Sequence, residues 1–382
     1  MPGAYKLIVF SSIQHFHSTA SLGTIATWFS IAQIICFLTS IGWATLILTR
    51  IPKTDPEKKI GEFNSILLMS ILTLIPFIII ISLIGYLFNK TEITNQINLW
   101  LAAWTLYQIP RHYCIAARSK IHAIVCDATI IIISAILIHL TPTTSLSLAL
   151  STTIILCSIT LTLSLQEKIK LPKLEIGYDT KGLQFGLTNL LSGGFGLCLV
   201  PLANFFEGED FAGMISIYLA LTALILLIPR ALSISYLPRV SALINTHNIA
   251  DILIEMRKRI FVSNLAAAVL SVVIVLSTIV LQAPKNPISV AIGLTLLTLL
   301  NFTTNQILAS TNILIAQESS KFMMELNLII FSLFTGAALL LISLNVPEGF
   351  NIICTIYLAL NITRLIIFNK KTAMYYASNR TL

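Results

Sequence analysis

The chain has 382 residues, of which 56% are apolar and 10% are charged, and its mean hydropathy is +0.89. Soluble domains carry about 25% charged residues, and a single water-soluble core cannot enclose this much apolar surface. These values exclude a soluble globular protein and predict an all-α integral membrane protein, and the net charge of +8 then indicates basic cytoplasmic loops rather than a nucleic-acid partner.

Eleven apolar stretches are long enough to cross a bilayer as helices. Crossing about 30 Å of hydrocarbon takes roughly 20 residues in a helix, and these unbroken runs differ from the alternating segments of barrel strands. A protein of about 11–12 transmembrane helices is therefore predicted. In chain order the spans are 24–48, 64–88, 96–115, 121–140, 145–165, 185–206, 211–235, 260–282, 289–310, 322–344 and 350–368.

Lysine and arginine are distributed unevenly between the two sets of connectors. Of the 24 Lys and Arg residues, 18 lie in alternate connectors that begin with 49–63 and end with the C-terminal tail, and three lie in the other connectors or the N-terminal segment. The remaining three are inside spans: Arg111, Arg230 and Arg364. Because cytoplasmic loops carry the excess of basic residues, the C-terminus is predicted to be cytoplasmic.

Two segments about half a chain apart resemble each other. Segments 23–50 and 213–239 each begin at glycine, carry an aromatic residue five positions later (Trp28 and Tyr218) and reach an arginine close to a proline. Their offset of about 190 residues predicts an internal repeat. Because each copy would hold six helices, an even number, the two lobes are predicted to be related by a pseudo-two-fold axis along the membrane normal.

The repeat divides the chain into an N-terminal lobe at 1–165, a basic cytoplasmic linker at 166–184 and a C-terminal lobe at 185–382. Residues 4–17 match only the last half of 185–206, the helix before the second copy. The first helix is therefore predicted to be incomplete. We expect about a dozen further residues of it to be encoded upstream, which the nucleotide sequence can show.

Two opposite charges fall in neighbouring spans. Arg111 in 96–115 and Asp127 in 121–140 are each eight residues from Ser119, the centre of the connecting turn. They should therefore lie at the same depth, where an ion pair is geometrically natural. Charges inside a bilayer are costly, so the pair is either a structural contact near the cytoplasmic face or part of a substrate cavity.

The other two arginines inside spans have different settings. Arg230 follows Pro229, which can kink its helix, and is either a cation that reaches the cytoplasmic face or a cavity residue. Arg364 lies close to the predicted end of its span and is interpreted as an anchor at the membrane surface.

Four uncharged polar residues fall on one face of a single predicted helix: Thr298, Asn301, Asn305 and Asn312. Their spacings of 3, 4 and 7 are those of a helical face. Amides and hydroxyls there suit a hydroxyl-rich ligand, and they serve equally well as hydrogen-bonding groups between helices.

A glycine-rich stretch lies within the span 185–206 and includes Gly193, Gly194 and Gly196. No strand precedes it and no Lys-Ser/Thr pair follows it, so it is not a phosphate-binding loop. It is predicted to be a packing or hinge site, as Pro229 is in its own helix.

Four passages carry a resemblance to a known family: 22–50, 116–120, 213–241 and 313–321. In them the chain is similar to the Wzx-type polysaccharide flippases, the O-antigen and capsule exporters of the multidrug/oligosaccharidyl-lipid/polysaccharide (MOP) superfamily. The short first helix departs from that pattern. The resemblance implies a multi-pass protein of the bacterial inner membrane, which moves an undecaprenyl-diphosphate-linked oligosaccharide from the cytoplasmic to the outer leaflet. It also implies membrane lipids, a polysaccharide polymerase and a chain-length regulator as partners.

Two other classes of function remain as alternatives. A drug or metabolite antiporter of the same superfamily would use buried carboxylates to couple ions, and Asp127 is the one convincing candidate. A membrane glycosyltransferase or polymerase would need acids, histidines or metal ligands on sizeable outer loops, and the loops here are short. The six cysteines form no CxxC pair, the spacing typical of metal and redox sites. No catalytic residue, metal or cofactor is predicted.

Overall fold

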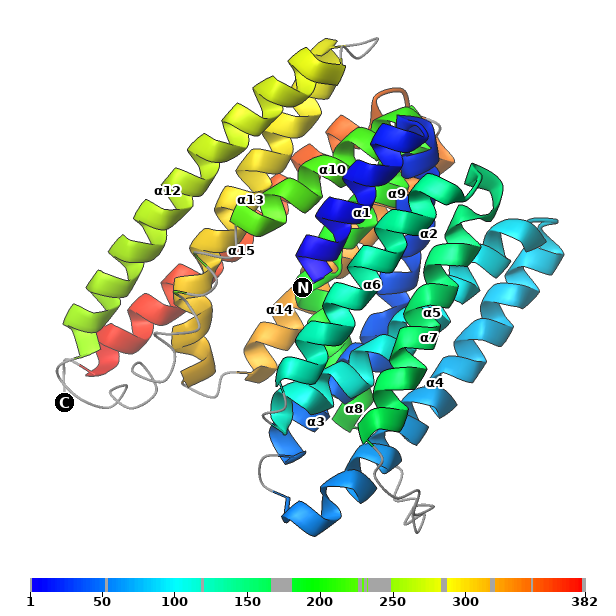
Figure 1. Cartoon of the computed structure of the whole chain (residues 1–382). Coiled ribbons are helices and arrows are strands. Elements are labelled where there is room, and N and C mark those ends of the chain that lie inside the picture. Colours follow the sequence, from blue (N-terminus) through cyan, green and yellow to red (C-terminus); the bar gives the residue numbers. More distant parts are fainter. Residues whose placement is uncertain are drawn as a thin grey trace. The chain divides into compact units, whose positions relative to one another are not determined.

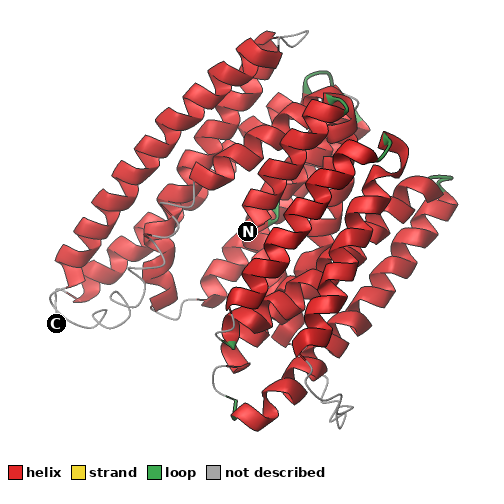
Figure 2. Cartoon of the chain, viewed as in Figure 1, coloured by secondary structure: helices red, strands yellow, loops and turns green. Residues whose placement is uncertain are grey.

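The computed structural model describes residues 2–51, 54–117, 120–165, 181–225, 229, 232, 249–282, 287–316, 320–344 and 346–379. Every regular element within these ranges is a helix (Figure 1, Figure 2). The fold is therefore the all-α, multi-span architecture that the composition predicts.

The chain forms two compact units, unit 1 at Met1–Ser216 and unit 2 at Ile217–Leu382. The predicted linker at 166–184 falls largely on residues 166–180, which lie outside the described residues, so the predicted lobe boundaries stay a prediction. Helix α10 (Glu209–Ile225) runs across the boundary between the units. The other helices of unit 1 are α1 (Pro2–Phe16), α2 (Thr19–Cys36), α3 (Gly42–Arg50), α4 (Lys59–Leu87), α5 (Thr91–Ala116), α6 (Lys120–Leu140), α7 (Thr143–Leu165), α8 (Lys181–Gly193) and α9 (Phe195–Glu207), with the π-turn η1 (Phe37–Ile41) and the 3-10 turn η3 (Pro56–Lys58).

In the described part of the chain, eight helical segments are long and apolar enough to span a membrane, and a ninth follows if α8 and α9 count as one span. Two predicted spans are helical but fail this test. The span 96–115 lies in α5, a long helix with many polar side chains, and α10 is described over only 17 residues. Helix α1, with 15 residues, is about 22 Å long, shorter than a bilayer core, and the incomplete first helix stays a prediction.

The predicted span 24–48 is not one regular helix, because the π-turn η1 separates α2 from α3. A π-turn leaves carbonyl groups without their usual helical partner. The hydroxyl of Ser70 donates to the Thr39 carbonyl over 2.6 Å, and the Thr39 and Thr105 hydroxyls are 2.9 Å apart. A buried hydroxyl of α4 therefore satisfies a backbone carbonyl of η1, and a hydroxyl of α5 bonds to the Thr39 side chain.

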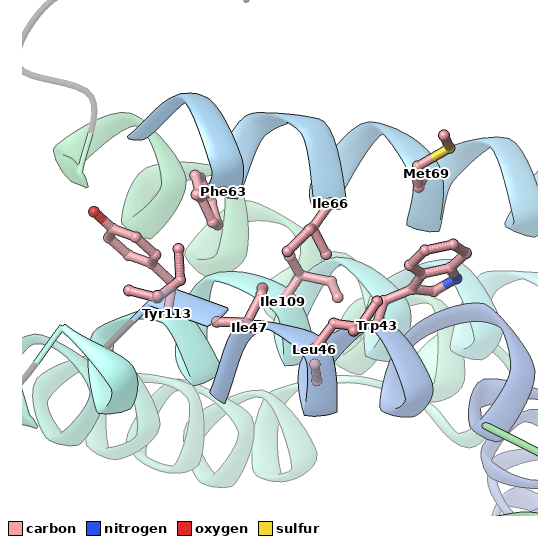
Figure 3. Packing of buried hydrophobic residues seen from close by; sticks show 10 residues of the cluster. Trp43, Leu46, Ile47, Phe63, Ile66, Met69, Ile109 and Tyr113 are labelled. Carbon is pink, nitrogen blue, oxygen red and sulfur yellow. The ribbon is translucent and has the colours of Figure 1, made fainter. Parts of the chain in front are cut away.

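A hydrophobic cluster joins α3, α4 and α5 in unit 1. Figure 3 shows Phe63 of α4 and Tyr113 of α5 at one end of the cluster and Trp43 of α3 at the other, with Ile47 and Ile109 between them. All five side chains are buried. The rings of Phe63 and Tyr113 pack with centroids 4.6 Å apart. This packing fixes the rotation of α5 and with it the direction of the polar side chains on its other face.

Unit 2 contains α12 (Ile249–Gln282), α13 (Pro287–Ala316), α14 (Ser320–Ser343) and α15 (Gly349–Asn379). Helix α13 packs against both α12 and α15, and α14 packs against α15. Two hydrogen bonds, Asn351 to Ser289 at 3.1 Å and Ser310 to Asn369 at 2.5 Å, join α13 and α15 at both ends. These bonds fix α13 and α15 as parallel neighbours.

Candidate functional site

Arg111 and Asp127 form a buried ion pair between α5 and α6. The Arg111 Nε lies 3.2 Å from Oδ1 and 3.1 Å from Oδ2 of Asp127, and Asp127 is 3% exposed. The hydroxyl of Tyr107, one helical turn before Arg111, also donates to Asp127 Oδ1. The two charges therefore meet as the sequence predicts, and a tyrosine that the sequence analysis did not single out completes the group.

A small pocket lies beside this ion pair in unit 1. Its walls are mostly apolar, and Asp127 supplies the charge. Aromatic rings pack around it in a chain, with Trp104 5.2 Å from Tyr107 and 5.0 Å from Phe29 between centroids. The Lys6 ammonium lies 5.2 Å from the Phe29 ring centroid, a cation–π distance. The lining residues are Tyr5, Trp104, Tyr107, Asp127, Ile130, Ile131 and Ile154.

The polar residues predicted on one face of α13 contact different neighbouring helices. Thr298 bonds to the Tyr218 hydroxyl of α10, whereas Asn305 donates to Asn264 Oδ1 of α12 over 3.2 Å. The Asn312 amide lies 3.9 Å from a methionine sulfur of α12. These contacts favour a role in helix packing for the three residues.

Asn301 differs from the other three residues of this face. Its Nδ2 is buried and has no hydrogen-bond partner among the described residues. Asn301 is therefore the member of the predicted face whose amide donor is unpaired in the described part of the chain, and its role in a substrate cavity stays a prediction.

The glycine-rich stretch coincides with a break in the helix. Segments Lys181–Leu191 and Phe195–Glu207 are bent by 58° relative to each other, so the predicted span 185–206 is two helices. Gly193 ends α8, Gly194 forms the turn and Gly196 lies in the first turn of α9. The bend lies at the glycines, and their predicted role as a packing or hinge site stays a prediction.

Replacing Gly194 by alanine should destabilise the protein by about 1–3 kcal/mol, whereas Gly196→Ala should not. A Cβ at Gly194 would lie 2.6 Å from the Leu190 carbonyl oxygen and 2.7 Å from Leu190 Cδ1, and a Cβ at Gly196 meets nothing within 4 Å. Thermal unfolding of the two purified variants in the same detergent measures the difference. Equal melting temperatures would contradict the close packing at Gly194.

The interpretation of Arg364 as a surface anchor is wrong. Helix α15 continues to Asn379, so Arg364 lies well inside the helix rather than near its end, and it is 7% exposed. Its guanidinium carbon lies 5.3 Å from the Phe368 ring centroid, and its Nε has no hydrogen-bond partner in the part of the chain that the structure describes. Arg230 lies outside the described residues, and Pro229 is buried.

The fold of the chain is shared by known structures. No protein-family model matches the chain, and no curated protein matches its sequence. Among solved structures, an inward-facing multidrug resistance MATE family transporter of the MOP superfamily superposes with a TM-score of 0.64 at 13% identity over 96% of each chain. A eukaryotic MATE transporter gives 0.61 at 13% identity, over 99% of this chain and 97% of the other.

A third match is a MOP superfamily transporter from Pyrococcus furiosus, described as having a binding pocket of reverse polarity that suggests a different function. Its TM-score is 0.59 at 13% identity, over 99% of this chain and 92% of the other. The chain therefore has the same fold as these transporters, an all-α membrane fold of two helical lobes.

Proposed function

We propose that the protein is a MOP-superfamily transporter that moves a lipid-linked oligosaccharide across the inner membrane of a bacterium. The cargo would be an undecaprenyl-diphosphate-linked repeat unit, carried from the cytoplasmic to the outer leaflet, with the C-terminus in the cytoplasm. The fold supports a transporter, and the flippase resemblance of the sequence supports this cargo. A polysaccharide polymerase and a chain-length regulator would act on the same cargo afterwards.

The observation that carries this proposal is the state of Asp127. Among the described residues Asp127 is the one acidic residue that is buried, and both of its oxygens are bonded to Arg111 or Tyr107. A carboxylate neutralised in this way offers no vacant site for a coupling cation or a cationic drug. The other candidate groups, Asn301 and Arg364, are neutral or positive and suit a glycan or its diphosphate.

A drug or metabolite antiporter is the second candidate, and the pocket beside Asp127 is the observation in its favour. An antiporter of this kind would require Asp127 to leave Arg111 during the transport cycle. An enzyme is the less favoured class. In the ranges that the structure describes, no group of three His, Cys, Asp or Glu residues could hold a metal ion.

Deleting the gene in its own cell tests the proposal. We expect loss of surface polysaccharide and accumulation of lipid-linked oligosaccharide in the cytoplasmic leaflet, because the assembled cargo cannot cross alone. A plasmid copy of the wild-type gene should reverse both effects. Unchanged polysaccharide together with increased drug sensitivity would instead favour the antiporter.

A further inference from the structure

At one end of unit 2, α14 and α15 present exposed lysines above a buried arginine. Lys321 and Lys371 are exposed, and Arg364 lies seven residues before Lys371, about 10 Å deeper along α15. The excess of basic residues in alternate connectors assigns this end of the helices to the cytoplasm. Positive charge therefore lies both at the surface, on the lysines, and deeper along α15, on Arg364.

Two aromatic rings connect the surface cation to the buried one. The Lys371 Nζ lies 5.5 Å from the Phe322 ring centroid, and the Arg364 guanidinium lies 5.3 Å from that of Phe368. The two rings are 6.1 Å apart. Both cations are therefore held by ring faces, which attract positive charge but leave the N–H donors available.

Two further unsatisfied polar groups lie at heights close to that of Arg364 along α14 and α15. The ring pairs Phe322–Phe368 and Phe334–Tyr357 set the antiparallel register of α14 and α15, so Asn327 and Arg364 lie at equivalent heights. Three polar atoms here have no hydrogen-bond partner among the described residues: Arg364 Nε, Asn361 Nδ2 and Asn327 Oδ1. Asn361 lies one turn before Arg364 on α15, and all three residues are at least nine-tenths buried.

No carboxylate of the described residues serves as the counter-ion of Arg364. Helices α13 and α15 contain no Asp or Glu, and Glu325 of α14 is exposed and pairs with Lys321 at 3.9 Å. A buried cation without a counter-ion is costly in a membrane, and such residues are usually functional. The missing partner should be an anion that enters from the basic end.

We propose that the cytoplasmic ends of α14 and α15 form a binding site for the anionic phosphate headgroup of a lipid. Lys371 attracts the phosphate at the surface, and Arg364 and Asn361 donate hydrogen bonds to its oxygens. A phosphate accepts from the planar guanidinium fork and satisfies the donors that the protein leaves free. The site rests on these contacts and not on what the protein transports, so the transport experiment can fail while this proposal holds.

The test measures lipid binding to the purified full chain in a neutral detergent. Phosphatidylglycerol and undecaprenyl phosphate should each raise the melting temperature of the wild type, and phosphatidylcholine, whose phosphate carries its own cation, should not. Arg364→Gln should weaken the binding at least about tenfold, the usual cost of a charge-assisted hydrogen bond. Arg364→Lys, which keeps the charge, should retain most of the shift.

Lys371→Gln and Lys370→Gln form a matched pair, because the two lysines are adjacent and exposed but only Lys371 lies over a ring in the described contacts. We expect weaker binding in Lys371→Gln and wild-type binding in Lys370→Gln, a comparison that does not depend on whether Arg364→Gln folds. Arg364→Gln without lipid should be at least as stable as the wild type, because an unpaired buried charge is gone.

Several outcomes would overturn the proposal. These are wild-type lipid shifts in Arg364→Gln, equal binding in the two lysine variants, or no response of the wild type to either phosphate lipid. A response to undecaprenyl phosphate alone would support the site and identify the carrier lipid as its ligand. A response to both lipids would support the site as one for anionic headgroups in general.

Discussion

Replacing Asp127 by alanine should destabilise the protein more than replacing both Asp127 and Arg111. The single change leaves the Arg111 guanidinium buried without its carboxylate, which typically costs about 3–5 kcal/mol, whereas the double change removes both charges. The Arg111 and Asp127 side chains are 13% and 2% exposed, so water compensates little for the lost partner. Thermal unfolding of the two purified variants, together with their folded yield from membranes, measures the order.

Two conservative changes serve as controls. Asp127→Asn keeps one acceptor oxygen for Arg111 and Tyr107 and should cost less than Asp127→Ala. Tyr107→Phe removes one hydroxyl donor to the carboxylate and should cost about 1–3 kcal/mol, the range for a hydrogen bond to a charged group. If the double variant is no more stable than Asp127→Ala, the energetic coupling inferred from the 3.1 Å contact is wrong.

The double variant also distinguishes a structural role of the Arg111–Asp127 pair from a role in transport. If Arg111 attracts the cargo diphosphate, the Arg111→Ala/Asp127→Ala protein should fold and yet fail to restore surface polysaccharide in the deletion strain. Folding together with full complementation would reduce the pair to a structural contact. The pair is therefore testable in both of the roles that the sequence leaves open.

The depth of this pair could be predicted by counting residues from the turn, because both helices rise about 1.5 Å per residue. Tyr107 lies one turn before Arg111 and shares its face, so the third member of the group was also within reach of the sequence. Its contact with Asp127 depends on how α5 is rotated, and the packing of Phe63 and Tyr113 decides that. Such packing between distant segments is not visible in a periodicity.

Other features depended on neighbours that a single sequence does not identify. One face of α13 meets both α10 and α12, so Thr298 and Asn305 have partners on different helices. The last turns of α15 are polar, so the apolar stretch of the sequence ends at 368 although the helix continues. Arg364 was therefore predicted to lie closer to the membrane surface than it does. The π-turn at Phe37–Ile41 has an apolar sequence like that of the helices beside it.

The repeat inferred from the sequence has a local counterpart in unit 1. A Cβ placed on Gly23 of α2 would overlap the Glu209 carbonyl oxygen and lie 2.9 Å from the Gly213 nitrogen. A Cβ placed on Gly213 of α10 would overlap the Thr19 carbonyl oxygen. Each glycine therefore faces the backbone carbonyl of the residue four positions before the other glycine. A local two-fold axis produces such a reciprocal contact. The same two glycines begin the segments that the sequence aligns.

Gly23→Ala and Gly213→Ala should each destabilise the protein by about 3 kcal/mol or more. The added methyl group meets backbone atoms, which cannot rotate away as a side chain can, so α2 and α10 must separate. Gly61→Ala and Gly336→Ala are matched controls, because a Cβ there meets nothing within 4 Å and alanine favours a helix by about 1 kcal/mol over glycine. Thermal unfolding in one detergent compares the four variants.

The double variant Gly23→Ala/Gly213→Ala tests the reciprocity itself. Once one methyl group has separated the helices, the second meets less resistance, so the double change should cost clearly less than the sum of the single changes. Residues that share a contact typically show such non-additivity by about 0.5–3 kcal/mol, whereas independent sites add within about 0.5 kcal/mol. Full additivity would mean that the two glycines do not share one crossing point, and the structural support for the repeat would then be lost.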